Sequence, residues 1–175
     1  VDGAKLVLDT SINKNETTIS GSVSGDNKLT VDFNGAATDS GNSAKLTLNG
    51  NAELKAITLG ANSKNNTLTV ASGSTSVNDN FSLTTGQEMS FEIRNGAKLA
   101  FANGLTNTGG TLNIKSEETA QQATQTGMAG NISTSDGTTN LYFKDSLWTP
   151  AFATTREGTT SGTISVSGGT SNIVV

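Results

Sequence analysis

The sequence predicts an all-β protein, and its first interpretation is a β-solenoid whose short strands stack as coils around a thin core. Only 33% of the 175 residues are apolar and 15% are charged, while Thr, Ser, Gly and Asn make up about half of the chain. That apolar share is low for a thick globular core, and the charge is low for a disordered chain. Aromatic residues account for 5%, so the core between two packed sheets would be hard to fill. We expect a right-handed parallel β-helix, with a β-sandwich as the alternative.

Runs in which apolar and polar residues alternate indicate the individual strands, because successive side chains of a strand point to opposite faces. In Glu88–Arg94, for example, Met89, Phe91 and Ile93 share one face and polar residues share the other. Taken in order along the chain, the same pattern predicts strands at Lys5–Asp9, Thr17–Ser20, Lys28–Phe33, Lys45–Asn49, Glu53–Leu59, Thr67–Ala71, Phe81–Thr84, Glu88–Arg94, Lys98–Ala102, Thr111–Lys115, Asn140–Lys144, Thr163–Val166 and Asn172–Val175.

Turn residues and the spacing of these strands favour the solenoid over the sandwich. A strand followed by Asn-Gly or Ser-Gly recurs, as at Leu48–Gly50 and Val166–Gly168. At about 20–25 residues per coil, the chain would form roughly seven to eight coils. The residues that we expect to point inward are Leu46, Leu48, Leu68, Val70, Phe91, Ile93, Leu99, Phe101, Leu112 and Ile114.

Residues 116–138 interrupt this rhythm, because the stretch from Ser116 to Thr126 lacks large apolar side chains. We therefore expect one β-solenoid segment over residues 1–175, belonging to a longer protein, with a non-strand insertion at 116–138. A surface insertion between coils is the simpler interpretation of that stretch than a functional element.

Three phrases carry a resemblance to a known family: Gly50–Ile57, Gly96–Phe101 and Gly109–Ile114. Each begins with glycine and leads into an alternating Leu, Ile or Phe pattern. In this style the chain resembles the β-helical passenger domains of bacterial autotransporters, the type V secretion system. The resemblance implies export across the outer membrane and folding into a cell-surface or secreted stalk that displays adhesive or toxic loops in virulence.

The residue inventory restricts enzymatic chemistry. The chain has no His and no Cys, which excludes Ser-His-Asp, Cys-His and His-metal arrangements. Carboxylate pairs remain conceivable for a polysaccharide hydrolase, with Glu88 and Glu92 as one candidate pair. A second candidate set is Asp26, Asp32 and Asp39. Because Glu92 lies next but one to Arg94, a solvated ion pair is the simpler interpretation, and we expect no catalytic residues and no enzyme.

Metal ions, cofactors and nucleic acids are also not expected as partners. The eight aspartates do not recur at a period, unlike those of calcium-binding repeats, so we expect no metal site and no cofactor. A formal net charge of −4 disfavours binding to nucleic acid. No apolar run has the length of a membrane span.

An aromatic cluster near the C-terminus is the candidate partner-binding site. It comprises Tyr142, Phe143, Trp148 and Phe152. An exposed patch of this kind would suit a host-cell protein or glycan, or other copies of the chain, whereas a packed cap on the solenoid is the favoured structural interpretation. The functional expectation is a non-catalytic stalk, adhesin or toxin scaffold. Its alternative is a self-assembling surface-layer or filament subunit built of β-sandwich domains.

Overall fold

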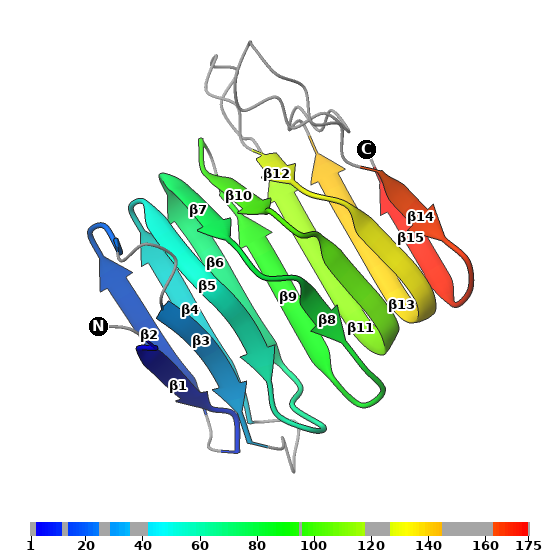
Figure 1. The fold of residues 1–175 in the computed structure, drawn as a ribbon, viewed down its shortest axis with the longest axis horizontal. Helices are drawn as coiled ribbons and strands as arrows, with labels where there is room; N and C mark the ends of the chain where they lie inside the picture. The colour runs from blue at the N-terminus through cyan, green and yellow to red at the C-terminus, as the bar shows by residue number, and fades with distance from the viewer. Residues whose placement is uncertain are drawn as a thin grey trace.

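The computed structural model describes residues 3–11, 14–24, 29–35, 42–94, 96–117, 127–144 and 163–174. Within these ranges the chain forms fifteen β-strands and no helix. The strands are parallel and stack as a β-solenoid of about five turns, which Figure 1 shows from its side. The predicted fold class is thereby confirmed, and the sandwich alternative does not apply.

The fifteen strands fall into two parallel sheets that face each other across the core (Figure 1). The first sheet has six strands, in the order β1 (Lys5–Asp9), β3 (Leu29–Asn34), β5 (Ala52–Leu59), β7 (Ser74–Val77), β10 (Lys98–Phe101) and β12 (Gly127–Ala129). The second contains β2 (Asn15–Ser20), β4 (Ala44–Asn49), β6 (Asn66–Ser72), β9 (Glu88–Ile93), β11 (Leu105–Glu117), β13 (Ile132–Lys144), β14 (Ile164–Val166) and β15 (Thr170–Val174), with β8 (Phe81–Leu83) paired to β11.

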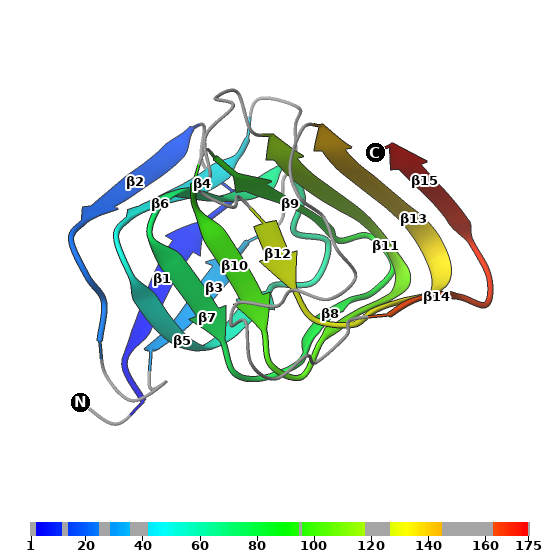
Figure 2. The same cartoon turned by 90° about the horizontal axis from the view of Figure 1, so that it is seen from above.

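The two longest strands, β11 and β13, each turn a corner and so contribute to two faces. The first part of β11 pairs with β8 and its second part with β9, and β13 divides in the same way between β14 and β15. The register between β11 and β13 shifts between Asn107 and Thr111, beside Gly109 and Gly110. Figure 2 shows both strands curving around this corner.

Coils of unequal length explain why the solenoid has fewer turns than expected. Leu46 pairs with Leu68, 22 residues later, but Asn15 pairs with Ala44, a step of 29 residues. Asn140 and Asn172 are 32 residues apart and occupy neighbouring coils. The expected seven to eight coils were therefore too many, because a uniform coil of about 22 residues holds only in the middle of the chain.

The core consists of apolar columns in which each side chain packs on its partner in the next coil. One column runs through Leu46, Leu68, Phe91, Ile114 and Leu141. All ten residues predicted to point inward are buried, with at most 2% of their surface exposed, so the predicted register is confirmed. In the middle of the solenoid, Phe81, Phe91 and Phe101 pack edge to face, with ring centroids 5.1 and 5.2 Å apart for the two closest pairs.

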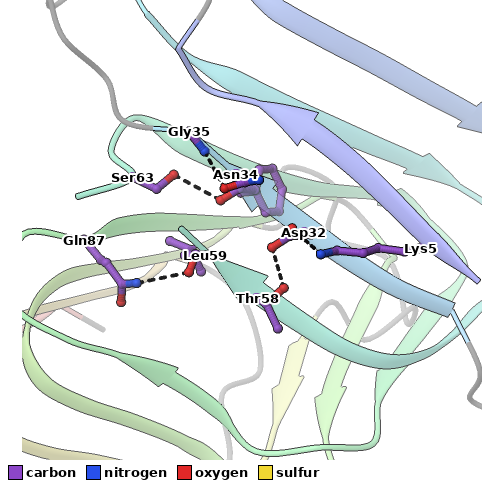
Figure 3. A network of polar contacts seen from close by, with 9 residues as sticks. Lys5, Asp32, Asn34, Gly35, Thr58, Leu59, Ser63 and Gln87 are labelled. Carbon is purple, nitrogen blue, oxygen red and sulfur yellow. Dashed lines mark hydrogen bonds and ion pairs between the residues drawn. The ribbon is translucent and has the colours of Figure 1, made fainter. Parts of the chain in front are cut away.

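Polar side chains inside one corner bind the coils to one another (Figure 3). The Ser63 hydroxyl donates to the carbonyl of Phe33 at 3.2 Å, and the amide of Asn66 donates to the carbonyl of Glu88 at 2.9 Å. The Gln87 amide donates to the carbonyl of Gly60 at 3.1 Å. The carbonyls of Phe33 and Gly60 also accept backbone amides, from Gly60 and Ser63 respectively, so these side chains add further bonds between coils.

The predicted insertion at 116–138 needs a correction. Residues 127–129 form β12 in the first sheet and residues 132–138 form the first part of β13. Thr134 and Thr139 are buried and their hydroxyls lie 2.8 Å apart in a hydrogen bond, so small polar residues fill core positions here. The prediction failed because Met128 and Ile132 are the only large apolar residues between 127 and 138, too few for an alternating pattern. Residues 118–126 lie outside the described ranges.

Candidate functional site

The first carboxylate candidate, Glu92, lies on the outward face of β9 within a group of cations. Its Oε2 atom accepts a hydrogen bond from the Thr69 hydroxyl at 3.0 Å. The same atom lies 3.8 Å from a guanidinium nitrogen of Arg94 and 3.9 Å from Nζ of Lys45. The ion pair expected between Glu92 and Arg94 is present, and partly exposed pairs of this kind contribute little to stability.

The second carboxylate candidate, Asp32, is held on the outward side of the first sheet (Figure 3). Oδ2 lies 2.7 Å from Nζ of Lys5, and Oδ1 accepts a hydrogen bond from the Thr58 hydroxyl at 2.6 Å. Lys5 and Thr58 come from the coils on either side, so Asp32 links three strands, β1, β3 and β5. Its partners Asp26 and Asp39 in the predicted set lie outside the described residues.

Asp9 has a carboxyl whose pKa is shifted by its local hydrogen bonds. The Ser11 hydroxyl donates to Oδ1 of Asp9 at 2.6 Å, and the Ser11 backbone amide donates to the same atom at 2.8 Å. These two bonds hold the pKa of Asp9 below its ordinary value, the hydroxyl having the larger effect. Both donors lie two residues further along the chain, which is a common turn arrangement of aspartate.

Among the described residues, no three Asp or Glu side chains gather into a group that could coordinate a metal ion. In the same ranges, the chain forms no helix of the length and hydropathy needed to cross a membrane.

Two of the four aromatic candidates lie among the described residues, and they point to opposite sides of β13. Tyr142 lies half-buried on β13, with Nζ of Lys115 5.8 Å from its ring centroid, within the range of a cation–π contact. Phe143 follows it in the strand, points to the opposite side and packs in the core with 2% of its surface exposed. The expectation that Phe143 shares an exposed surface is therefore wrong, because neighbouring residues of a strand alternate between faces. Trp148 and Phe152 lie outside the described residues.

A ladder of amides, which sequence reasoning missed, runs across the outward face beside Tyr142. The Asn172 amide donates to Oδ1 of Asn140 at 2.8 Å, and Asn140 donates in the same way to Asn113 at 2.8 Å. The Asn113 amide then donates to the Ser90 hydroxyl at 3.2 Å. The signal was an asparagine at the same place in three strands, and it becomes visible only once the register is known. We call Ser90, Asn113, Asn140, Asn172 and Tyr142 the outer polar face.

A shallow groove lies on the other side of the molecule, over the outward surface of β5, β7 and β10. Its volume is about 390 Å³. Small side chains, among them Ser74, Ser76 and Ala100, form much of its lining, together with the charged Glu53 and Lys98.

Comparison with known proteins returns no match: no family model, curated protein or solved structure matches the chain significantly. Function is therefore inferred from the solenoid and its outward surfaces.

Proposed function

We propose that this chain is a non-catalytic scaffold, a segment of a bacterial cell-surface or secreted protein that presents a binding surface to a host-cell protein or glycan. The observation that carries the proposal is that most strands have an apolar inward side, which forms the core, and a polar outward side, which forms the surface. Inward columns, such as Leu46, Leu68 and Phe91, form a continuous apolar core. Outward columns of the same strands are polar, so the surface can vary without disturbing the fold.

The outer polar face is the part of this surface best suited to contact a partner. The amide ladder fixes Asn113 and Asn140 in single orientations through hydrogen bonds of 2.8 Å. Beside it, Tyr142 offers an aromatic ring held over Lys115. A preorganised aromatic ring with neighbouring hydrogen-bonding groups binds at low entropic cost and is common among binding hot spots.

Membership of the autotransporter passenger domains belongs to the same proposal. It is supported by the parallel solenoid and by the glycine-led phrases, two of which lead into β5 and β10 while the third lies within β11. The alternative of a self-assembling subunit built of β-sandwich domains loses its structural basis, because the sheets are formed by parallel coils.

The test compares binding and folding in matched variants. Binding of the chain to cultured cells and to a glycan array is measured for the wild type, Tyr142→Ala and Glu92→Gln, together with each melting temperature. We expect Tyr142→Ala to weaken binding at an unchanged melting temperature and Glu92→Gln to leave binding unchanged. Polysaccharide hydrolysis that disappears in Glu92→Gln or in Asp32→Asn would overturn the non-catalytic assignment, and wild-type protein that binds no cell and no glycan would overturn the presenting role.

A further inference from the structure

Asparagine is followed by glycine at four places in the chain: Asn34-Gly35, Asn49-Gly50, Asn95-Gly96 and Asn103-Gly104. This dipeptide is chemically reactive, because glycine has no side chain to shield its backbone nitrogen from the side-chain amide of the preceding asparagine. A hydrogen bond from that nitrogen to a backbone carbonyl opposes the reaction, since the nitrogen must first leave its partner. The fold therefore decides which of these pairs can react.

The Asn34-Gly35 pair, at the end of β3, holds the glycine nitrogen beside the asparagine side chain (Figure 3). The Gly35 amide donates to Oδ1 of Asn34 at 2.9 Å, and it makes no other hydrogen bond to the residues that the structure describes. Oδ1 is bonded to Cγ, the carbon that the nitrogen would attack, so the two reacting atoms are close together. Asn34 is exposed, and water can reach both.

The Asn49-Gly50 pair, at the end of β4, is held differently. The Gly50 amide donates to the carbonyl of Ser72 at 3.2 Å, so its nitrogen belongs to the bonds between neighbouring coils. Attack on Asn49 would break one of these bonds. Asn95 of another pair lies outside the described residues.

The Asn103-Gly104 pair, in the turn after β10, is held at both reacting groups. The Gly104 amide donates to the carbonyl of Phe101 at 3.2 Å. The side-chain amide of Asn103 donates to the carbonyl of Asn78 at 2.7 Å. Both bonds would have to break before the Gly104 nitrogen could reach the side chain of Asn103.

The fold also requires the glycine of the reactive pair. Gly35 has a φ of +102°, and a Cβ at this position would lie 2.5 Å from Oδ1 of Asp9 in the preceding coil. Any other residue would therefore have a strained backbone and would collide with a charged group. The structure thus retains glycine after Asn34, and with it the unshielded nitrogen.

We propose that Asn34 is a site of spontaneous modification, at which the asparagine converts through a succinimide ring to aspartate and isoaspartate. The Gly35 nitrogen loses its proton and bonds to Cγ of Asn34, while the Cγ–Nδ2 bond breaks and ammonia leaves with that proton. Water then opens the ring at one of its two carbonyls. Opening at Cγ gives aspartate, and opening at the α-carbonyl gives isoaspartate, whose main chain runs through Cβ and Cγ. This site does not depend on the proposed presentation of a binding surface.

Isoaspartate at this position would disturb the bonds that join the first coils. The Asn34 carbonyl accepts the Thr10 amide at 2.7 Å, and the Gly35 carbonyl accepts the Thr10 hydroxyl at 2.6 Å. Thr10 is fully buried, and its hydroxyl lies 3.1 Å from that of Ser63, in the turn between β5 and β6. An additional carbon in the main chain separates the two carbonyls, so Thr10 could no longer bond to both and a buried donor would lose its partner.

Peptide mapping by mass spectrometry tests which site reacts. The folded protein is incubated at neutral and at mildly alkaline pH and digested with trypsin, which places Asn34, Asn49 and Asn103 on the separate peptides 29–45, 46–55 and 99–115. We expect Asn34 to convert several-fold faster than the other two, and faster at the higher pH because the attacking nitrogen must lose its proton. In urea all three should convert at similar rates. Equal rates in the folded protein, or the same preference for Asn34 in urea, would overturn the proposal.

The product and its effect on the fold test the route. Succinimide opening gives isoaspartate as well as aspartate, so a product that contains only aspartate would contradict the mechanism. The matched control is Asn34→Gln, which keeps an amide but would have to close a larger ring; Asn34→Ser replaces it if that variant does not fold. After incubation, the wild type should gain a fraction with a lower melting temperature, whereas the variant and Asn49→Gln should behave as unreactive and as wild type respectively. Converted wild type that melts like fresh protein would refute the role assigned to the Thr10 bonds.

Discussion

Replacing Leu68 by aspartate tests the core column most directly. Leu68 is fully buried on β6, between Leu46 and Phe91 in the neighbouring coils. Loss of a buried leucine side chain costs about 2–5 kcal/mol. A carboxylate in the same apolar position has no partner to bond, which adds roughly another 1–3 kcal/mol. We therefore expect Leu68→Asp to lower the free energy of unfolding by at least about 3 kcal/mol, a large part of the 5–15 kcal/mol typical of a domain.

The matched control for Leu68→Asp is Thr67→Asp. Thr67 is the preceding residue of the same strand, points outward and is in register with Lys45. An aspartate there faces solvent and a cation, so its effect should stay within about 0.5 kcal/mol. Urea unfolding followed by far-UV circular dichroism gives both values. If Leu68→Asp were tolerated while Thr67→Asp unfolded the protein, the inward and outward faces would be exchanged and the register wrong by one residue.

Four other measurements test separate parts of the structure. Gly73 has φ +74°, and an added Cβ would lie 2.6 Å from the carbonyl carbon of Gly50, so Gly73→Ala should destabilise by more than about 1 kcal/mol in urea unfolding. The side-chain amide of Asn107 donates to the Thr138 carbonyl at 2.9 Å, and its Oδ1 accepts from the Gly110 backbone amide at 2.9 Å. Asn107→Ala should lower the free energy of unfolding by roughly 1–3 kcal/mol, and Asn107→Asp, which keeps the acceptor, should recover part of that loss. Asp9 has a lowered pKa in the folded state. Its contribution to stability is therefore present above the unfolded-state pKa and is lost as the pH falls through the folded-state pKa. Asp9→Asn should remove this pH dependence and flatten that part of an acid-unfolding curve. Trp148→Ala should lower the melting temperature if the tryptophan packs as a cap, and lower only partner binding if it belongs to an adhesive patch.

Strict alternation made much of the fold predictable from the sequence. In β9, Met89, Phe91 and Ile93 are inward and Ser90 and Glu92 are outward, as the pattern indicates. Such strands are recognised because one face consists of large apolar residues. The same reasoning missed β7, whose Ser-Thr-Ser-Val sequence contains one large apolar residue. The neighbouring coils, β5 and β10, complete the pairing of β7 and override its weak local signal.

Features that depend on contacts between neighbouring coils could not be predicted from the sequence. The amide ladder from Ser90 to Asn172 joins residues 23–32 positions apart, and no local pattern specifies that pairing. The corner in β11 was not predicted because Gly109 and Gly110 resemble a turn between two strands. In the structure they continue one strand onto a second face. Phe143 was grouped with Tyr142 by proximity in sequence, although alternation already places the two on opposite faces.

The middle coils have a consequence for the length of the molecule. Leu46, Leu68 and Phe91 succeed one another at intervals of 22 and 23 residues, and each coil contacts mainly its immediate neighbours. Deleting the interval that contains Leu68 would place Phe91 directly on Leu46, so that one apolar side chain of the column would still pack on another. Duplicating one would add about 4.8 Å to the stack. Loss or duplication of a gene segment of this size would therefore change the length of the solenoid by one coil and leave the packing of the core intact.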